Sequence, residues 1–267
     1  MEAFLKHLAQ TKKSATLASY RRDLERMRAH FAPRALWEVD EESLRGYFAS
    51  LSHRLAPNSF SRALCVARRY YRFLEEEGRI ASSPVSAFRA TLFRTKEPSL
   101  LTDEEMDLLL SAPAHGIRGK RDAAMIALLC ETGMQASELV GMDRTDLCPL
   151  RSSVLCGLGE RRREIPVSSE TMALLETSLA LSTLQYPDSE ALFHGKTGKR
   201  MTRQGFWKNL KERAIRLGIY PCTPQLLRLS FARRCLYDGK KRAEVRTLLG
   251  NRSDALLREY EKQKKGI

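Results

Sequence analysis

The chain has 267 residues, an apolar fraction of 43%, and 46 Lys and Arg against 32 Asp and Glu, which gives a formal net charge of +14. This length suits one large or two modest domains, and the apolar fraction is high enough to form cores, so a wholly disordered chain is excluded. No apolar run approaches the roughly 18 residues of a membrane-spanning helix, and no signal-peptide pattern opens the sequence. We therefore expect a cytoplasmic protein.

The positive charge is spread along the chain. Residues 1–90 carry 16 basic and 10 acidic side chains, and the remainder carries 30 and 22. An excess of positive charge in both parts is typical of a protein that uses both parts to bind a polyanion such as nucleic acid. The alternative that charge alone leaves open is a solubilising surface without a specific partner.

Cysteine and histidine residues show no pattern of a metal or redox site. The six cysteines form no C-x-x-C pair, and most lie within apolar runs, which favours reduced core residues. The five histidines are scattered without metal-ligand spacing, and none follows His194. The sequence therefore predicts no bound metal and no cofactor.

Apolar periodicity predicts helices in the first part of the chain. Between residues 17 and 31 apolar side chains recur at spacings of 3, 4, 3 and 4, typical of one face of a helix, with Ser14 as its N-cap. Further helices are expected over residues 41–52 and 58–77. The second of these ends at Gly78, which occupies the position of a C-terminal helix cap.

The second part is predicted to be mainly helical with one β-hairpin. Thr102 and Glu105 form a capping box that opens a helix over residues 104–110. Two short strands, 153–156 and 163–167, are joined by a glycine-containing turn. Later helices are expected over residues 170–181, 202–217, 224–237 and 243–249.

These elements predict two domains. Residues 1–90 form a helical domain, residues 91–100 a linker, and residues 101–267 the second domain. The basic stretch 194–199 contains two glycines but lacks the spacing of a phosphate-binding loop, so it is interpreted as a basic hairpin.

Segments along nearly the whole chain together resemble the tyrosine recombinase family, which includes phage integrases and Xer recombinases. The matching segments are 69–78 (RYYRFLEEEG), 101–105 with 111–113, 131–139 (ETGMQASEL), 157–167 with its closing Ile-Pro-Val, 223–232 (TPQLLRLSFA), and 248–251 (LLGN) with Tyr260 nine residues beyond. The resemblance implies a mainly α fold, with a helical SAM-like core-binding domain and an α-rich catalytic-type domain that contains a small antiparallel sheet. It also implies a clamp around double-stranded DNA.

The family's chemistry divides among several side chains. A tyrosine attacks a backbone phosphate, two arginines and histidine donors stabilise the phosphate oxygens in the transition state, and a lysine protonates the leaving oxygen. By this resemblance the chain keeps the nucleophile, Tyr260, and the second arginine, Arg228. The other four positions are degenerate and hold Gln135, Leu158, Gln225 and Asn251.

These substitutions predict a protein that has kept DNA binding and lost most of its cleavage chemistry. Glutamine and asparagine donate hydrogen bonds but exchange no proton near neutral pH, and leucine has no proton to give. We interpret the chain as a pseudoenzyme that serves as an accessory or regulator of DNA recombination or of nucleoid DNA. Two alternatives remain: an active recombinase that uses relocated groups such as Arg144 or the hairpin arginines, and a non-specific nucleoprotein scaffold or protein-interaction module.

Clusters of basic residues on the third helix, on the hairpin and around the second basic turn are the candidate DNA contacts. They are Arg62, Arg68, Arg69, Arg72, Arg161, Arg162, Arg163, Lys199, Arg200, Arg203 and Lys208. Only seven residues follow Tyr260, whereas Xer-like relatives carry a longer terminal helix that docks on a neighbouring subunit. We therefore expect a monomer off DNA, and on DNA a partner role beside an active recombinase.

Overall fold

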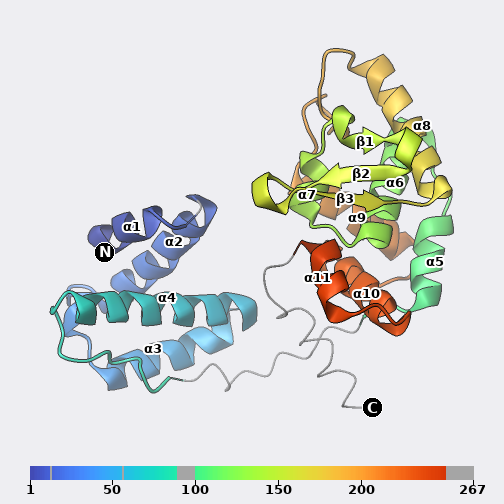
Figure 1. Cartoon of the computed structure of the whole chain (residues 1–267). Helices are drawn as coiled ribbons and strands as arrows, with labels where there is room; N and C mark the ends of the chain where they lie inside the picture. The colour runs from blue at the N-terminus through green and yellow to red at the C-terminus, as the bar shows by residue number, and fades with distance from the viewer. Residues whose placement is uncertain (13, 56, 89–99, 251–267) are drawn as a thin grey trace. The chain divides into compact units, whose positions relative to one another are not determined.

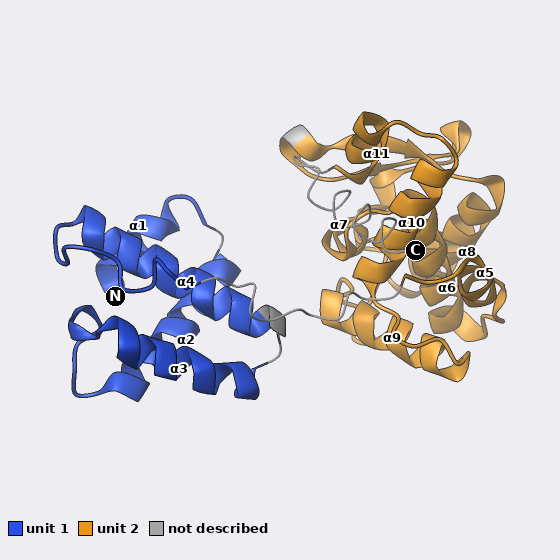
Figure 2. Ribbon diagram, turned by 90° about the horizontal axis from the view of Figure 1, so that it is seen from below, with its two compact units in different colours: residues 1–97 blue, residues 98–267 orange. Residues whose placement is uncertain are grey.

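The chain divides into two compact units, Met1–Glu97 and Pro98–Ile267, which Figure 2 shows in two colours. The structure is a computed structural model and describes residues 1–12, 14–55, 57–88 and 100–250. Most of the linker expected over residues 91–100 lies outside these ranges.

The described residues of the first unit form helices joined by turns and loops, without a β-strand (Figure 1). The helices are α1 (Glu2–Ala9), α2 (Ser14–Phe31), the short 3₁₀ helix η1 (Leu36–Glu38), α3 (Glu41–Arg54) and α4 (Pro57–Glu76). The three helices expected here are confirmed to within two residues, apart from Ser14, which is the first residue of α2 instead of its cap. The helix α1 was not predicted.

Aromatic residues of α4 form the centre of this first core. Tyr70 and Tyr71 are almost completely buried, and the Tyr71 hydroxyl donates a hydrogen bond to the Leu36 carbonyl oxygen at 2.8 Å. Phe4 of α1 packs edge-on against Tyr70, with 5.5 Å between ring centroids. Gly78 ends this region with φ at +66°, a conformation that glycine adopts without strain, as its cap position predicts.

The second unit combines helices with one small sheet. Its helices are α5 (Asp103–Ser111), α6 (Gly116–Thr132), α7 (Ala136–Gly141), α8 (Ser169–Gln185), α9 (Arg203–Arg216), α10 (Pro224–Tyr237) and α11 (Arg242–Leu249), with short 3₁₀ turns η3 (Arg144–Asp146), η4 (Pro149–Arg151) and η5 (Gly159–Arg161). The sheet is antiparallel in the order β1 (Leu147–Cys148), β2 (Ser153–Cys156), β3 (Arg163–Pro166). The predicted hairpin is β2–β3, in which Val154 pairs with Ile165.

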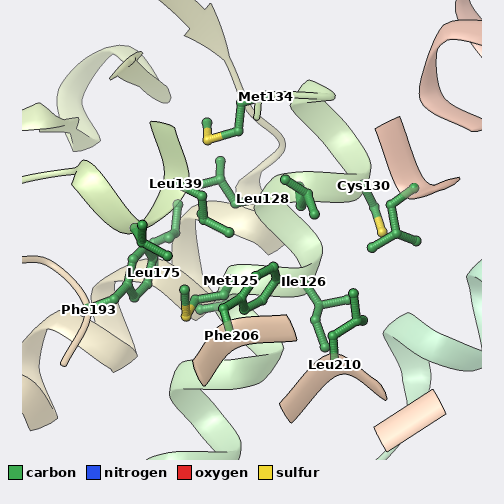
Figure 3. Packing of buried hydrophobic residues seen from close by; sticks show 14 of the residues in the cluster. Met125, Ile126, Leu128, Cys130, Met134, Leu139, Leu175, Phe193, Phe206 and Leu210 are labelled. Atoms are coloured by element: carbon green, nitrogen blue, oxygen red, sulfur yellow. The ribbon is translucent and has the colours of Figure 1, made fainter. Parts of the chain in front are cut away.

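Helix α6 forms the centre of the second core and was not predicted. All of its residues from Ala123 to Cys130 are buried, so this half of the helix has no polar face and no amphipathic period to detect. Figure 3 shows Met125, Ile126 and Leu128 of this helix among side chains from other elements. Those partners include Leu175 of α8, and Phe206 and Leu210 of α9.

Gly133 ends α6 in a left-handed conformation, with φ at +58°. A Cβ atom there would overlap the Phe231 ring and come within 2.9 Å of Leu249 Cδ2. We expect Gly133→Ala to lower the free energy of unfolding by about 2 kcal/mol or more, because backbone strain and overpacking add. Gly141→Ala is the matched control, since its Cβ would meet nothing within 4 Å, and should change stability by less than about 0.5 kcal/mol. Equal denaturation midpoints for the two variants would contradict this assignment.

Among the residues that the structure describes, no helix combines the length and the apolar character needed to cross a lipid bilayer.

Candidate functional site

Arg228 joins two of the segments that carry the predicted catalytic positions. It lies on α10, and its side chain is buried with only 3% of the residue exposed. Its Nη1 donates a hydrogen bond to the Gly133 carbonyl oxygen at 2.5 Å, and its Nη2 donates one to the Leu249 carbonyl oxygen at 2.7 Å. The guanidinium therefore ties α10 to the turn before Gln135 and to the end of α11.

Arg163 of strand β3 makes a second set of ties to the same segments. Its Nη1 and Nη2 donate to the two carboxylate oxygens of Glu138 at 2.8 and 3.2 Å, a bidentate ion pair. Its Nε donates to the Leu248 carbonyl oxygen at 2.7 Å. Together with Arg228, this pair links the hairpin, α7, α10 and the end of α11.

Burial and charge shift the pKa values of this cluster. Burial lowers the pKa of Arg228 to about 10, although the nearby Glu138 carboxylate opposes that shift. Burial acts to raise the pKa of Glu138, but hydrogen bonds from Arg163 and from the Gln135 backbone outweigh it, so the net shift is downward. Two arginines and one carboxylate therefore remain charged at neutral pH.

The structure describes three of the four positions that the resemblance predicts to be substituted. Gln135 is the half-buried N-cap residue of α7, and its backbone N–H donates to Glu138 Oε2 at 2.7 Å. Leu158 is 86% exposed at the hairpin turn, and Gln225 is exposed in the first turn of α10. Amide groups can donate hydrogen bonds here, but none of the three side chains offers a transferable proton. The remaining two predicted site residues, Asn251 and Tyr260, lie outside the described residues.

Three of the predicted DNA contacts are held in contacts within the protein. Arg62 pairs with Asp23, whose side chain is 2% exposed, at 2.8 Å. Arg163 forms an ion pair with Glu138. Arg200 forms an ion pair with Asp143 and donates hydrogen bonds to the carbonyl oxygens of residues 141 and 142. For these arginines the geometry favours a structural role over a phosphate contact.

The other predicted DNA contacts lie nearer the surface. Arg162 pairs with Asp146 at 3.0 Å, and Lys208 lies 3.8 Å from Glu212, both through partly exposed side chains. The remainder form no ion pair with any described residue and are exposed, or half-exposed in the case of Arg68; they are Arg68, Arg69, Arg72, Arg161, Lys199 and Arg203. Unpaired surface cations are the side chains best placed to neutralise a phosphate.

A basic cleft of about 900 Å³ lies between the start of α6, the turn after His194 and α9. Nine basic side chains line it against Asp122 and Glu212; they are His115, Arg118, Arg121, Lys196, Lys199, Arg200, Lys208, Arg213 and Arg216. Three of these, Lys199, Arg200 and Lys208, are among the predicted contacts. The arginines of α6 were not predicted as contacts, although residues 118–121 form a basic cluster in the sequence, because the helix that carries them was not predicted.

His194 provides a pH-dependent contribution to the stability of the second unit. Its ring nitrogens lie 2.8 Å from the Ser182 hydroxyl and 2.7 Å from the Ser189 hydroxyl. Burial, followed by repulsion from Arg144, Arg200 and Arg121, lowers the pKa of His194.

The folded protein therefore binds this proton less readily than the unfolded chain does. Stability should fall as the pH drops below about 6.5, the ordinary histidine pKa, and level off below the folded pKa. Urea denaturation of the unaltered chain and of His194→Gln between pH 5 and 8 checks this. The variant should lose part of the acid-dependent slope, and identical slopes would contradict the assignment.

Comparisons with known proteins agree with the fold. Residues 99–266 match the phage integrase family, and residues 1–78 match the phage integrase N-terminal SAM-like domain. The chain is 32% identical to tyrosine recombinase XerC of Roseiflexus sp. (strain RS-1), over 97% of this chain and 88% of that protein. It is 31% identical to tyrosine recombinase XerC of Pseudomonas aeruginosa PAO1, again over 97% of this chain and 88% of the relative.

Solved structures show the same fold. XerH site-specific recombinase bound to its palindromic difH substrate aligns with a TM-score of 0.79 at 18% identity, over 94% of this chain and 77% of that one. The Tn1549 transposon integrase in complex with circular-intermediate DNA aligns with a TM-score of 0.80 at 14% identity, over 100% of this chain and 98% of that one. On the family match and the identity to XerC relatives, the chain belongs to the phage integrase family of tyrosine recombinases.

Proposed function

We propose that this chain binds double-stranded DNA and does not cleave it alone, and that it acts as an accessory or regulator of recombination beside an active recombinase. The observation that carries the proposal is that the structural contacts of the site are present while its predicted catalytic groups are exchanged. Arg228, Arg163 and Glu138 hold the site segments together, whereas the positions that would move a proton or supply the first positive charge hold other groups.

The rate losses expected from the missing catalytic groups support a nearly inactive site. Loss of one preorganised donor to a developing oxyanion typically lowers the rate by about 10² to 10³. Loss of a positioned general acid lowers it by about 10² to 10⁴. Such losses do not simply multiply, because members of one catalytic set act as a unit. The exposed Leu158 alone, at the position of the general acid, is therefore enough to make strand cleavage very slow.

An active enzyme with relocated groups is the second candidate. Arg161 favours it, because this arginine is exposed on the same hairpin turn as Leu158 and forms no ion pair with any described residue. Arginine can stabilise a phosphate, but its pKa above about 12 makes it a poor proton donor. Arg144 supports this alternative less, since it donates to the carbonyl oxygens of Pro187 and Tyr186.

A nicked suicide duplex separates the two candidates. Genomic footprinting of the tagged chain first defines its site, and the nick then traps any covalent intermediate because the freed strand diffuses away. We expect a gel shift of this duplex without a covalent band. A covalent band that disappears in Tyr260→Phe would overturn the proposal and favour the active enzyme. Equal affinity for the footprinted site and for random duplex would instead favour a non-specific scaffold.

Salt dependence tests the predicted DNA contacts. Phosphate neutralisation releases counterions, so the logarithm of the binding constant should fall by about 0.9 per phosphate for each log unit of salt. We expect the double variant Lys199→Gln/Arg203→Gln to reduce the magnitude of this slope by about 2. Arg45→Gln is the control, because Arg45 is already paired with Glu41 at 2.6 Å. Unchanged slopes in the double variant would remove these two side chains from the interface.

A further inference from the structure

We infer that a phosphoryl-binding pocket lies at the N-terminal end of α6, remote from the recombinase site. The pocket has a volume of about 460 Å³ and lies between the start of α6, the end of α8 and the turn that follows His194. Helix α6 has 17 residues, and at about 1.5 Å per residue its two ends lie about 25 Å apart. The site built around Gly133 and Arg228 lies at the other end.

The lining of this pocket is positively charged. No acidic residue lines it, whereas Arg118, Arg121 and Lys196 do. Arg121 is held in place by Asp122 at 2.6 Å and by the His194 carbonyl oxygen at 2.6 Å. Arg118 and Lys196 are exposed and form no ion pair with any described residue, so both can contact an incoming anion.

The helix end adds backbone donors to these side chains. The first four N–H groups of a helix have no partner within it, and the helix dipole places partial positive charge there. The N-cap residue of α6, His115, makes no capping hydrogen bond through its side chain, and the first turn contains no acidic residue. An anion at this position would satisfy groups that the protein leaves without a counter-charge.

A buried hydroxyl provides independent evidence for a ligand. Ser178 of α8 lines the pocket and is 3% exposed. Its Oγ has no hydrogen-bond partner among the described residues. Buried polar groups are nearly always satisfied, and rotation of the Ser178 side chain toward the pocket would offer its hydroxyl to an acceptor oxygen of the ligand.

Phosphate chemistry fits this set of groups better than a carboxylate does. Arginine, lysine, backbone N–H groups and a hydroxyl together supply donors in several directions, and a phosphoryl group offers three or more acceptor oxygens to them. The ligand could be a backbone phosphate of bound duplex or a phosphoryl group on a free molecule. Both sources present the same phosphoryl oxygens to the pocket, and the experiment below distinguishes them.

The test measures thermal unfolding of the full chain against inorganic phosphate, with ionic strength held constant by chloride. We expect the melting temperature to rise with the logarithm of the phosphate concentration once this exceeds the Kd. In Arg118→Gln/Lys196→Gln the phosphate concentration needed for a given rise should increase by about tenfold or more, because charge-assisted contacts are the stronger class. Ser178→Ala should increase it by a smaller factor. Lys120→Gln is the matched control, since Lys120 is exposed on α6 but does not line the pocket, and it should behave like the unaltered chain.

Repeating the titration with saturating duplex identifies the source of the ligand. If the phosphate effect disappears, the duplex supplies the phosphoryl group, and if it persists, the ligand is a free molecule. The inference is overturned if phosphate gives no rise in melting temperature at constant ionic strength. It is also overturned if the double variant and Lys120→Gln respond alike. Neither result depends on whether the chain cleaves DNA.

Discussion

Restoring the four exchanged positions should create a DNA-cleaving enzyme. We expect the variant Gln135→Arg/Leu158→Lys/Gln225→His/Asn251→His to form a covalent link through Tyr260 on a nicked duplex, where the unaltered chain forms none. Each restored donor should raise the rate by about 10² to 10³, and the restored general acid by about 10² to 10⁴. Because these groups act as a unit, the full variant should exceed any single substitution by far more than their separate effects indicate.

The structure explains why these substitutions should be tolerated. Leu158 and Gln225 are exposed, so lysine and histidine at those positions need no repacking of the core. Gln135 holds Glu138 through its backbone N–H, which an arginine would keep. The measurement is a denaturing gel of the trapped complex over time.

Two comparisons make the restoration result decisive. The same fourfold variant with Tyr260→Phe should bind the duplex and give no adduct. A fourfold variant that binds with unchanged affinity and still forms no adduct would show that further changes, beyond the four positions, block cleavage. An adduct of equal yield from the unaltered chain would contradict the proposed inactivity directly.

Removing the Glu138 carboxylate should destabilise the second unit more than any surface substitution. Glu138 and Arg163 are largely buried, with side chains 12% and 11% exposed, and Arg228 lies close enough to affect the pKa of Glu138. Breaking a buried ion pair by removing one partner typically costs about 3 to 5 kcal/mol, because the other charge stays buried without compensation. We expect Glu138→Ala to lower the free energy of unfolding by about this amount in urea denaturation.

A matched surface pair and a double variant check the reason for this loss. Glu212→Ala breaks the exposed pair with Lys208 and should cost about 0.5 kcal/mol or less. Adding Arg163→Met to Glu138→Ala should recover part of the loss, because it removes the uncompensated charge. If the single and double variants are equally unstable, packing around Glu138 and not its charge explains the effect.

The same carboxylate predicts how stability depends on acid. The pKa of Glu138 is lowered in the folded protein, so its contribution is complete above the ordinary glutamate pKa and is lost as the pH falls through the folded pKa. Glu138→Ala should therefore show a weaker loss of stability below about pH 4.3 than the unaltered chain does.

Local patterns predicted most of the helices and the hairpin correctly. The amphipathic spacing of α2, the capping box at Thr102 and Glu105, and the left-handed Gly78 each depend on residues close together in the chain. Such signals can be detected without knowing the fold. Helix α6 was missed for the opposite reason, since its apolar residues cover all sides and its helical period shows only when the surrounding elements are known.

The motifs predict which catalytic positions are substituted, but they do not predict the contacts that each arginine makes. Arg163 stands beside Arg161 and Arg162 in the sequence, and all three were expected to contact DNA. Only the fold brings Glu138, 25 residues earlier in the chain, against Arg163 and turns it into a buried structural cation. Arg62 is similarly held by Asp23, 39 residues away.

Motif resemblance was thus sufficient for the family, and periodicity for most of the helices, because both depend on residue identity at short range. The tertiary structure decided which cations are free to meet an anion and which are already neutralised inside the protein. It also placed the uncapped end of α6 beside Ser178 and Lys196, which are distant in sequence. The interaction between two charges depends on the distance between them in the folded protein, and the order of charges along the sequence does not give that distance.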